Sequence, residues 1–128
     1  MTEPLQRLYE AWNRDDPDVL VSFVHPDVEF RTSGHFPDLP DAYSGIEGIR
    51  AFHEQFTAPW ESLEIEPCRY ETNGERALAL WRFRGIGRGG VPVEREGAHI
   101  AVVRDGLIVD IQGYGSWKEA LADAGLES

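Results

Sequence analysis

The second half of the chain, from Trp60 onward, alternates apolar and polar residues with a period of two, which is typical of β-strands. Three dipeptides interrupt the alternation, and each favours the tight turn of a β-hairpin: Asn73-Gly74, Gly89-Gly90 and Asp105-Gly106. The sequence therefore predicts an antiparallel meander of four long strands over Glu61–Thr72, Arg76–Arg88, Val91–Arg104 and Leu107–Gly115.

The first half has helical periodicity instead. Leu5, Leu8, Tyr9 and Trp12 recur at the spacing of one helix face. Asp16-Pro17 then reads as the N-cap and first residue of a second, short helix. Further predicted features follow: an apolar helix face of Leu20, Phe23 and Val24, a helix end at His25-Pro26, a short strand over Asp27–Thr32 and a loop over Ser33–Tyr43.

Two serines begin capping-box patterns, Ser44-Gly45-Ile46-Glu47 and Ser116-Trp117-Lys118-Glu119. The first predicts a third helix that Pro59 ends, and the second predicts a terminal helix that Gly125 ends. The apolar face of the third helix is Ile46, Ile49, His53 and Phe56. The predicted order is αα-β-α-ββββ-α in one α+β domain over residues 1–128, with a small-molecule pocket between the helices and a curved sheet.

The charge balance excludes several classes of protein. A net charge of −11 argues against nucleic-acid binding and against attraction to anionic membranes. Cys68 is the only cysteine, and the four histidines lack metal-ligand spacing, so we expect no metal and no cofactor. Without a signal-like N-terminus or a long apolar run, a cytoplasmic location is the expectation.

Both faces of the second long strand contain apolar side chains. Ala77, Ala79, Trp81 and Phe83 alternate with Leu78, Leu80, Arg82 and Arg84. Three short helices can cover only one face of such a sheet, so Trp81 and Phe83 on the other face would be exposed. We therefore predict a homodimer that packs through this outer face.

Several runs of the sequence resemble SnoaL-like proteins of the nuclear transport factor 2-like superfamily. They are LYEAWNRDD (8–16), HPDVEF (25–30), SGIEGI (44–49) and AHIAVVRDG (98–106). The resemblance implies a cone-shaped α+β barrel, usually dimeric, whose curved antiparallel sheet wraps around three helices and is followed by a C-terminal helix. The superfamily includes isomerases, cyclases, epoxide hydrolases, dehydratases and non-catalytic binding domains, so the fold alone does not choose a function.

The resemblance also implies that two familiar chemistries are disfavoured. The catalytic aspartate of the steroid isomerases aligns with Arg31, and their catalytic tyrosine aligns near Leu8. The aspartate of SnoaL-type polyketide cyclases aligns near Gly113. The position of His99 corresponds to a hydrogen-bonding acid that contacts ligand in the isomerases.

The face that His99 occupies depends on the register of the Asp105-Gly106 hairpin. A three-residue loop, Arg104-Asp105-Gly106, pairs Val103 with Leu107 and places His99 opposite Ile111 on an apolar face. A two-residue loop places His99 beside Asp110 and Gln112. We favour the first, because it agrees with the isomerase alignment.

The candidate site follows from this register. We expect catalytic roles for His99, Glu29 and Arg31, and ligand contacts from Trp12, His53, Phe56, Trp60 and Arg82. Arg31 or Arg82 would bind an anionic oxygen and Glu29 or His99 would move a proton. The alternative, which is the commoner case for charge pairs on an exposed strand, is that Glu29 and Arg31 only neutralise each other at the mouth of the cone.

The expected function is cofactor-free acid/base chemistry, of the isomerase, cyclase, lyase or hydratase type, on an apolar molecule that carries oxygen. The alternatives are a non-catalytic ligand-binding or dimerisation domain and a protein-interaction module.

Overall fold

The computed structural model describes residues 2–32 and 39–126 and contains one strongly curved sheet. The strand order is β2-β1-β6-β5-β4-β3, with β1 and β6 parallel and all other neighbours antiparallel. The strands are β1 (Val24–Arg31), β2 (Ala42–Ser44), β3 (Trp60–Asn73), β4 (Arg76–Gly87), β5 (Pro92–Arg104) and β6 (Leu107–Tyr114). The predicted four-strand meander is confirmed within a residue or two at each end.

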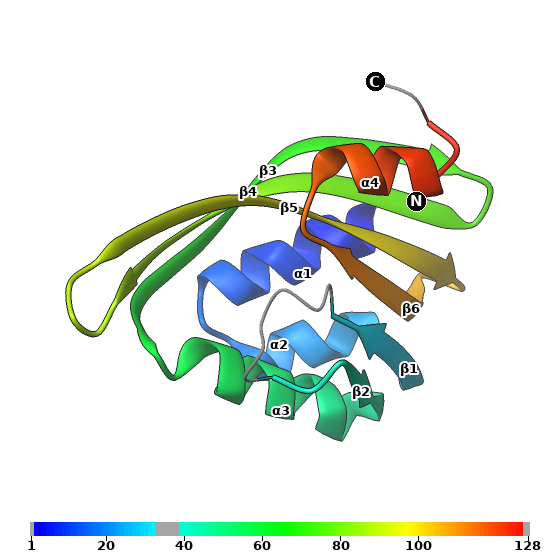
Figure 1. The fold of residues 1–128 in the computed structure, drawn as a ribbon. Helices are drawn as coiled ribbons and strands as arrows, with labels where there is room; N and C mark the ends of the chain where they lie inside the picture. The colour runs from blue at the N-terminus through cyan, green and yellow to red at the C-terminus, as the bar shows by residue number, and fades with distance from the viewer. Residues whose placement is uncertain (1, 33–38, 127–128) are drawn as a thin grey trace.

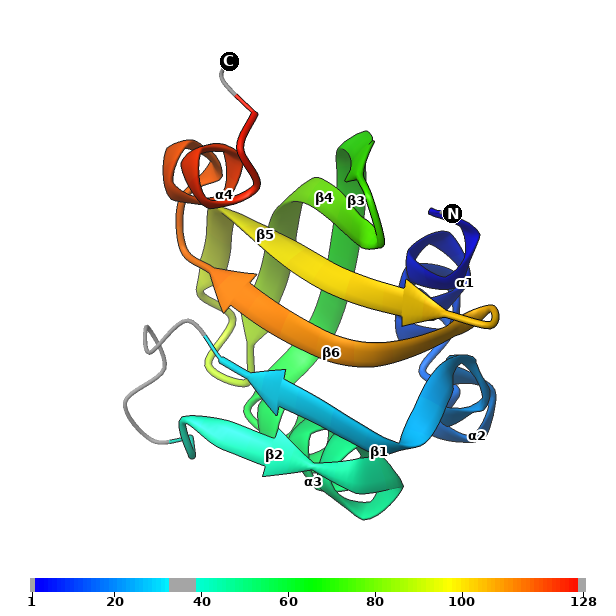
Figure 2. The same cartoon turned by 90° about the vertical axis from the view of Figure 1, so that its right-hand side faces the viewer.

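The helices lie on both sides of this sheet (Figure 1). They are α1 (Glu3–Asn13), α2 (Pro17–Leu20), α3 (Gly45–Thr57) and α4 (Trp117–Asp123), with a 3₁₀ turn over Val21–Phe23. The first three lie within the concave side of the sheet, and α4 lies on the convex side (Figures 1 and 2). The predicted α+β fold, a cone of curved sheet around three helices, is confirmed, but β2 and β3 are free edges and the barrel is not closed. No helix among the described residues is long and apolar enough to cross a membrane.

Two boundaries in the first half differ from the prediction. β1 begins at Val24, not Asp27, because Val24 is buried and pairs with Ile108 across the parallel seam. Pro26 lies between Val24 and Glu29, where the β1–β6 register shifts, and a strand tolerates proline at such an irregularity. The predicted loop over Ser33–Tyr43 contains β2, whose Tyr43 is buried against Phe30, while residues 33–38 lie outside the described part.

The two capping boxes have different outcomes. The Ser116 side chain accepts a hydrogen bond from the Glu119 backbone N–H at 3.1 Å, as predicted. Ser44 occupies the N-cap of α3 but makes no capping bond, because its hydroxyl donates to Glu29 Oε2 at 2.7 Å. Asp16 caps α2 as predicted, accepting from the Val19 N–H at 3.2 Å.

The β5–β6 hairpin combines features of both predicted registers. Arg104 pairs with Leu107, so the turn has two residues, and Asp105 and Gly106 both have positive φ (53° and 78°). The three-residue loop is therefore wrong. A bulge at Val109 then shifts the register by one, so that His99 lies opposite Gly113. This shift restores His99 to the predicted apolar face.

The predicted outer face of the sheet is wrong. Trp81 and Phe83 point to the concave side, where Phe83 is only 5% exposed. Leu78 and Leu80 point to the convex side and are buried against Ala120, Leu121 and Ala124, in α4 or at its C-terminal end. The alternation could not choose between two apolar faces, because the short terminal helix covers the second one. The homodimer stays a prediction, without these two aromatic side chains to support it.

Gly97 on β5 lies directly beneath the indole of Trp81, and a Cβ there would be 2.2 Å from the ring. We expect Gly97→Ala to lower the free energy of unfolding by about 2 kcal/mol, because the enclosed indole has little room to move. Gly89→Ala is the matched control, since a Cβ at Gly89 meets nothing within 4 Å. Urea denaturation of both variants checks this, and equal stabilities would contradict the packing.

Candidate functional site

A cavity of about 350 Å3 lies between the concave face of the sheet and the helices α1 and α3. Its wall is mainly aliphatic and aromatic. The helices contribute Leu5, Leu8, Tyr9, Trp12, Ile49, Phe52 and Phe56, and the strands contribute Phe30, Ile65, Trp81, Phe83, Ala98, His99, Ile111 and Gly113. Arg95, Glu96, Thr32, Tyr114 and Gly115 also border it, with Leu20. This size and lining are typical of a site for a small apolar molecule.

Three polar side chains meet inside this apolar wall. The Tyr9 hydroxyl lies 2.7 Å from Nδ1 of His99, and the indole N–H of Trp81 donates to the same nitrogen at 3.1 Å. The three residues come from α1, β4 and β5, and the Tyr9 and His99 rings stack with their centroids 5.8 Å apart. Buried polar groups need partners, and these three satisfy one another.

This geometry fixes the tautomer of His99. An indole N–H can only donate, so Nδ1 must accept and carries no proton. A neutral imidazole then carries its proton on Nε2, which has no hydrogen-bond partner among the described residues. His99 borders the cavity and is only partly buried. The ring therefore offers one free donor, the Nε2–H, for a ligand.

Burial keeps the polar groups of the cavity neutral. It lowers the pKa of His99 to about 4, because the charged imidazolium would lose its hydration. Burial also raises the pKa of Tyr9 well above its usual 10, an effect that nearby Tyr70 adds to and the Trp81 hydrogen bond opposes. Near pH 7 the site holds a neutral imidazole and a neutral phenol.

Two of the predicted ligand contacts line the cavity and two lie behind its wall. Trp12 and Phe56 border it directly. His53 is buried behind Trp12, with its ring edge-on to the indole, and its Nε2 lies 3.0 Å from Asp15 Oδ1 without hydrogen-bond geometry. Trp60 packs edge-on against Phe83 from the far side.

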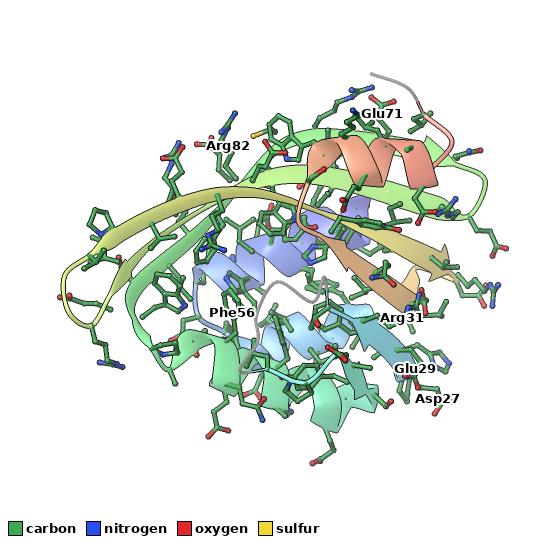
Figure 3. All side chains as sticks on the ribbon, viewed as in Figure 1. Asp27, Glu29, Arg31, Phe56, Glu71 and Arg82 are labelled. Carbon is green, nitrogen blue, oxygen red and sulfur yellow. The ribbon has the colours of Figure 1, made fainter. Side chains whose placement is uncertain are left out.

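The other charged candidates do not join His99. Glu29 and Arg31 share a face of β1, as predicted, but that face is exposed and turned away from the cavity. Arg31 binds both carboxylate oxygens of Asp110 at 2.8 Å, which raises its pKa, and it makes no ion pair with Glu29. Figure 3 shows Glu29 and Arg31 on the outside of β1 and Phe56 in the interior.

Arg82 lies on the convex side of the sheet (Figure 3). Its guanidinium is 5.0 Å from the ring centroid of Trp117 and 4.0 Å from Glu94. Of the predicted catalytic and anion-binding residues, only His99 is at the cavity. Arg82 lies outside because β4 turns the opposite face to the cavity from the one predicted: Arg82 alternates with Trp81, and Trp81 points inward.

Tyr9, Trp81 and Arg95 border the cavity but were not among the sequence candidates. Tyr9 was predicted only as part of an apolar helix stripe, although its hydroxyl marked it as a possible donor. Trp81 was placed on the wrong face of the sheet. Arg95 is two residues from Gly97 and four from His99, so the period of a strand places all three on one face.

The lowered pKa of His99 makes stability dependent on pH. The unfolded chain binds this proton near pH 6.5 and the folded chain only near pH 4, so stability falls as the pH drops through that window. Between pH 7 and pH 4 we expect the wild-type protein to lose about 3 kcal/mol more unfolding free energy than His99→Gln. Denaturant titrations across this range measure the difference, and parallel pH profiles would contradict the burial of a neutral His99.

Comparisons with known proteins agree with this fold. The profile of the family described as "SnoaL-like domain" matches residues 5–111. No curated protein sequence matches the chain. TerC, crystallised with polyporic acid, superposes with a TM-score of 0.82 at 18% identity, and the match covers 95% of each chain.

Two further structures are similar. A protein of Catenulispora acidiphila with a ketosteroid isomerase-like fold, in complex with trimethylamine, has a TM-score of 0.78 at 20% identity over 98% of this chain and 94% of its own. A protein of Xanthomonas campestris assigned as a polyketide cyclase has a TM-score of 0.77 at 23% identity over 96% and 95%. At these identities the likeness shows the fold alone. Because the family profile spans most of the sequence, the chain belongs to the SnoaL-like domain family.

Proposed function

We propose that the protein binds a small, flat, largely apolar molecule in the cavity through one hydrogen-bond acceptor. The observation that carries this proposal is the free Nε2–H of His99 in a mainly apolar wall, with the imidazole held in place by Tyr9 and Trp81. A donor of this kind selects a carbonyl, ether or enolate oxygen, because an uncompensated donor in an apolar site disfavours a ligand without an acceptor.

The wall favours an aromatic or otherwise planar ligand. Trp12, Phe52 and Phe56 pack on one another with ring centroids 5.3–5.8 Å apart and form an aromatic surface opposite the sheet. Aromatic rings bind flat molecules by stacked and edge-on contacts. The binding of polyporic acid by TerC and of trimethylamine by the Catenulispora protein supports the same use of the fold for small ligands.

The second candidate is cofactor-free catalysis, such as isomerisation, cyclisation or elimination. It is favoured by the strongly perturbed pKa of His99 inside a cavity, which is common at catalytic sites. With His99 neutral near pH 7, its Nε2–H would polarise a carbonyl by hydrogen bonding and stabilise the enolate that forms when a base from solution removes an α-proton. A neutral imidazole can act as an electrophile in this way.

Acetonaphthone and ethylnaphthalene form a matched pair of probes, because only the ketone has an acceptor oxygen. We expect the wild-type protein to bind acetonaphthone more tightly, and His99→Leu to weaken the ketone about tenfold while ethylnaphthalene binds as before. Tyr9→Phe should cause a smaller loss, since Trp81 still holds the ring. Calorimetric titration measures these affinities.

Glu29→Gln is the matched control, because Glu29 lies outside the cavity and should not affect either probe. Thermal unfolding of each variant establishes that it is folded. Equal affinity of wild type and a folded His99→Leu for acetonaphthone would contradict the proposed role of Nε2.

Proton exchange separates the binding function from catalysis. Enolate stabilisation would accelerate exchange of the methyl protons of acetonaphthone in D2O, and NMR measures that rate. Exchange above the buffer rate that is lost in His99→Leu supports an enzyme. Tight binding with exchange only at the buffer rate supports a binding domain.

A further inference from the structure

Arg95 is a cationic side chain at the border of an apolar cavity, on the same strand as His99. We propose that Arg95 binds an anionic group of the ligand, so that the cavity is specific for an elongated apolar acid: an uncharged oxygen at the His99 end and a carboxylate or ionised hydroxyl at the Arg95 end. This inference rests on the proposed binding function and adds the ligand's charge and length to it.

The sheet register places Arg95 on the inner face. Arg95 pairs with Phe83, which is buried and lines the cavity, and Gly97 and His99 follow at intervals of two residues on the same face. The side chains of Glu94 and Glu96, the neighbours of Arg95, alternate to the convex side, although Glu96 also borders the cavity. Glu94 lies 4.0 Å from Arg82, and Glu96 accepts a hydrogen bond from the Trp117 N–H at 3.0 Å.

Arg95 also differs from the other arginines of the sheet in its partners. Arg31 binds Asp110, Arg82 lies beside Glu94, and Arg84 lies beside Glu64, Glu66 and Glu94. Arg95 has no ion pair or hydrogen bond with residues 2–32 or 39–126. In a chain of net charge −11, carboxylates are abundant. A guanidinium that borders an apolar cavity without one of them is therefore available for an anion from solution.

The spacing along β5 sets the length of the ligand. His99 follows Arg95 by four positions on β5, so their Cα atoms are about 13 Å apart at the usual rise of a strand. Phe83 and Trp81 line the wall between the two polar ends. A molecule that reaches both ends needs an apolar body of about two rings, which the cavity of about 350 Å3 can hold.

Anilinonaphthalene sulfonate and phenylnaphthylamine test this proposal, since both have the same apolar body and only the first carries a charge. We expect the two dyes to compete for the wild-type cavity. Arg95→Gln should weaken the sulfonate at least tenfold and leave the uncharged dye unaffected. Rising salt should weaken the sulfonate in wild type but have little effect in the variant. Dye fluorescence measures all four affinities.

Arg82→Gln is the matched control, because it removes a positive charge from the convex face of the same sheet. It should bind both dyes as the wild type does. Arg95→Lys should restore part of the sulfonate affinity.

Two outcomes separate the failure of this inference from the failure of the proposed function. If the uncharged dye binds but Arg95→Gln binds the sulfonate as tightly as wild type, or wild type does not bind the sulfonate, the role of Arg95 is overturned and the cavity remains a binding site. If neither dye binds a wild-type protein that does bind acetonaphthone, the role of Arg95 is overturned and the proposed function stands; if acetonaphthone does not bind either, both proposals are overturned.

Discussion

The packing of Trp81 on Gly97 determines which side of the sheet forms the cavity. The glycine leaves room for the indole against the β5 backbone, and the indole N–H then reaches His99. With Trp81 inside, the alternate residues of β4 must face outward. There Leu78 and Leu80 need a cover, which α4 provides. The packing of Trp81 on Gly97 is thus consistent with three features at once: the side of the sheet that forms the cavity, the orientation of the β4–β5 hairpin and the position of α4.

The same constraint separates charge from the cavity. Arg82 and Arg84 lie beside glutamates on the convex face. Arg31 of β1 pairs with Asp110 of β6 on the face of these strands that is turned away from the cavity. The concave side retains few polar groups, and most of them are uncharged. Desolvation lowers the pKa of His99 because it disfavours the charged imidazolium. The two donors at Nδ1 also occupy the nitrogen to which a second proton would bind. The cavity therefore presents a neutral hydrogen-bond donor, the Nε2–H of His99.

Much of the fold could be predicted from the sequence because the local signals agree with one another. Three glycine-containing turns mark the meander, and helical spacing marks α1 and α3. β2 could not be predicted, since it is a three-residue edge strand held by tertiary contacts of Tyr43. The start of β1 was missed because Val24 fits the apolar face of the predicted helix as well as it fits a buried strand. Its strand partner, Ile108, lies 84 residues away and could not be identified from the local pattern.

The candidate site was predicted only in part, because a residue belongs to it only if its helix or strand face is turned to the cavity, whatever the residue type. Trp12 and Phe56 are at the cavity where helical periodicity places them, and His99 is there because the bulge at Val109 restores its predicted face. Glu29, Arg31 and Arg82 have suitable chemistry but face outward. Both faces of β4 are apolar at one end, so alternation could not decide which face was inside. Arg95 was overlooked because its place at the cavity depends on which face of β5 is turned inward.

The bulge at Val109 makes the chemistry of the cavity wall depend on a single residue of spacing. Before the bulge, β6 follows the register of the two-residue turn, and after it every side chain has changed faces. Ile111 and Gly113 consequently face the cavity, while Asp110 and Gln112 bind Arg31 on the outer face. Gain or loss of one residue in this strand would exchange an aliphatic wall for an acid and an amide, with no substitution at any position of the wall. In a fold used for many reactions, strand length is thus a means of changing the active groups while the core sequence is kept.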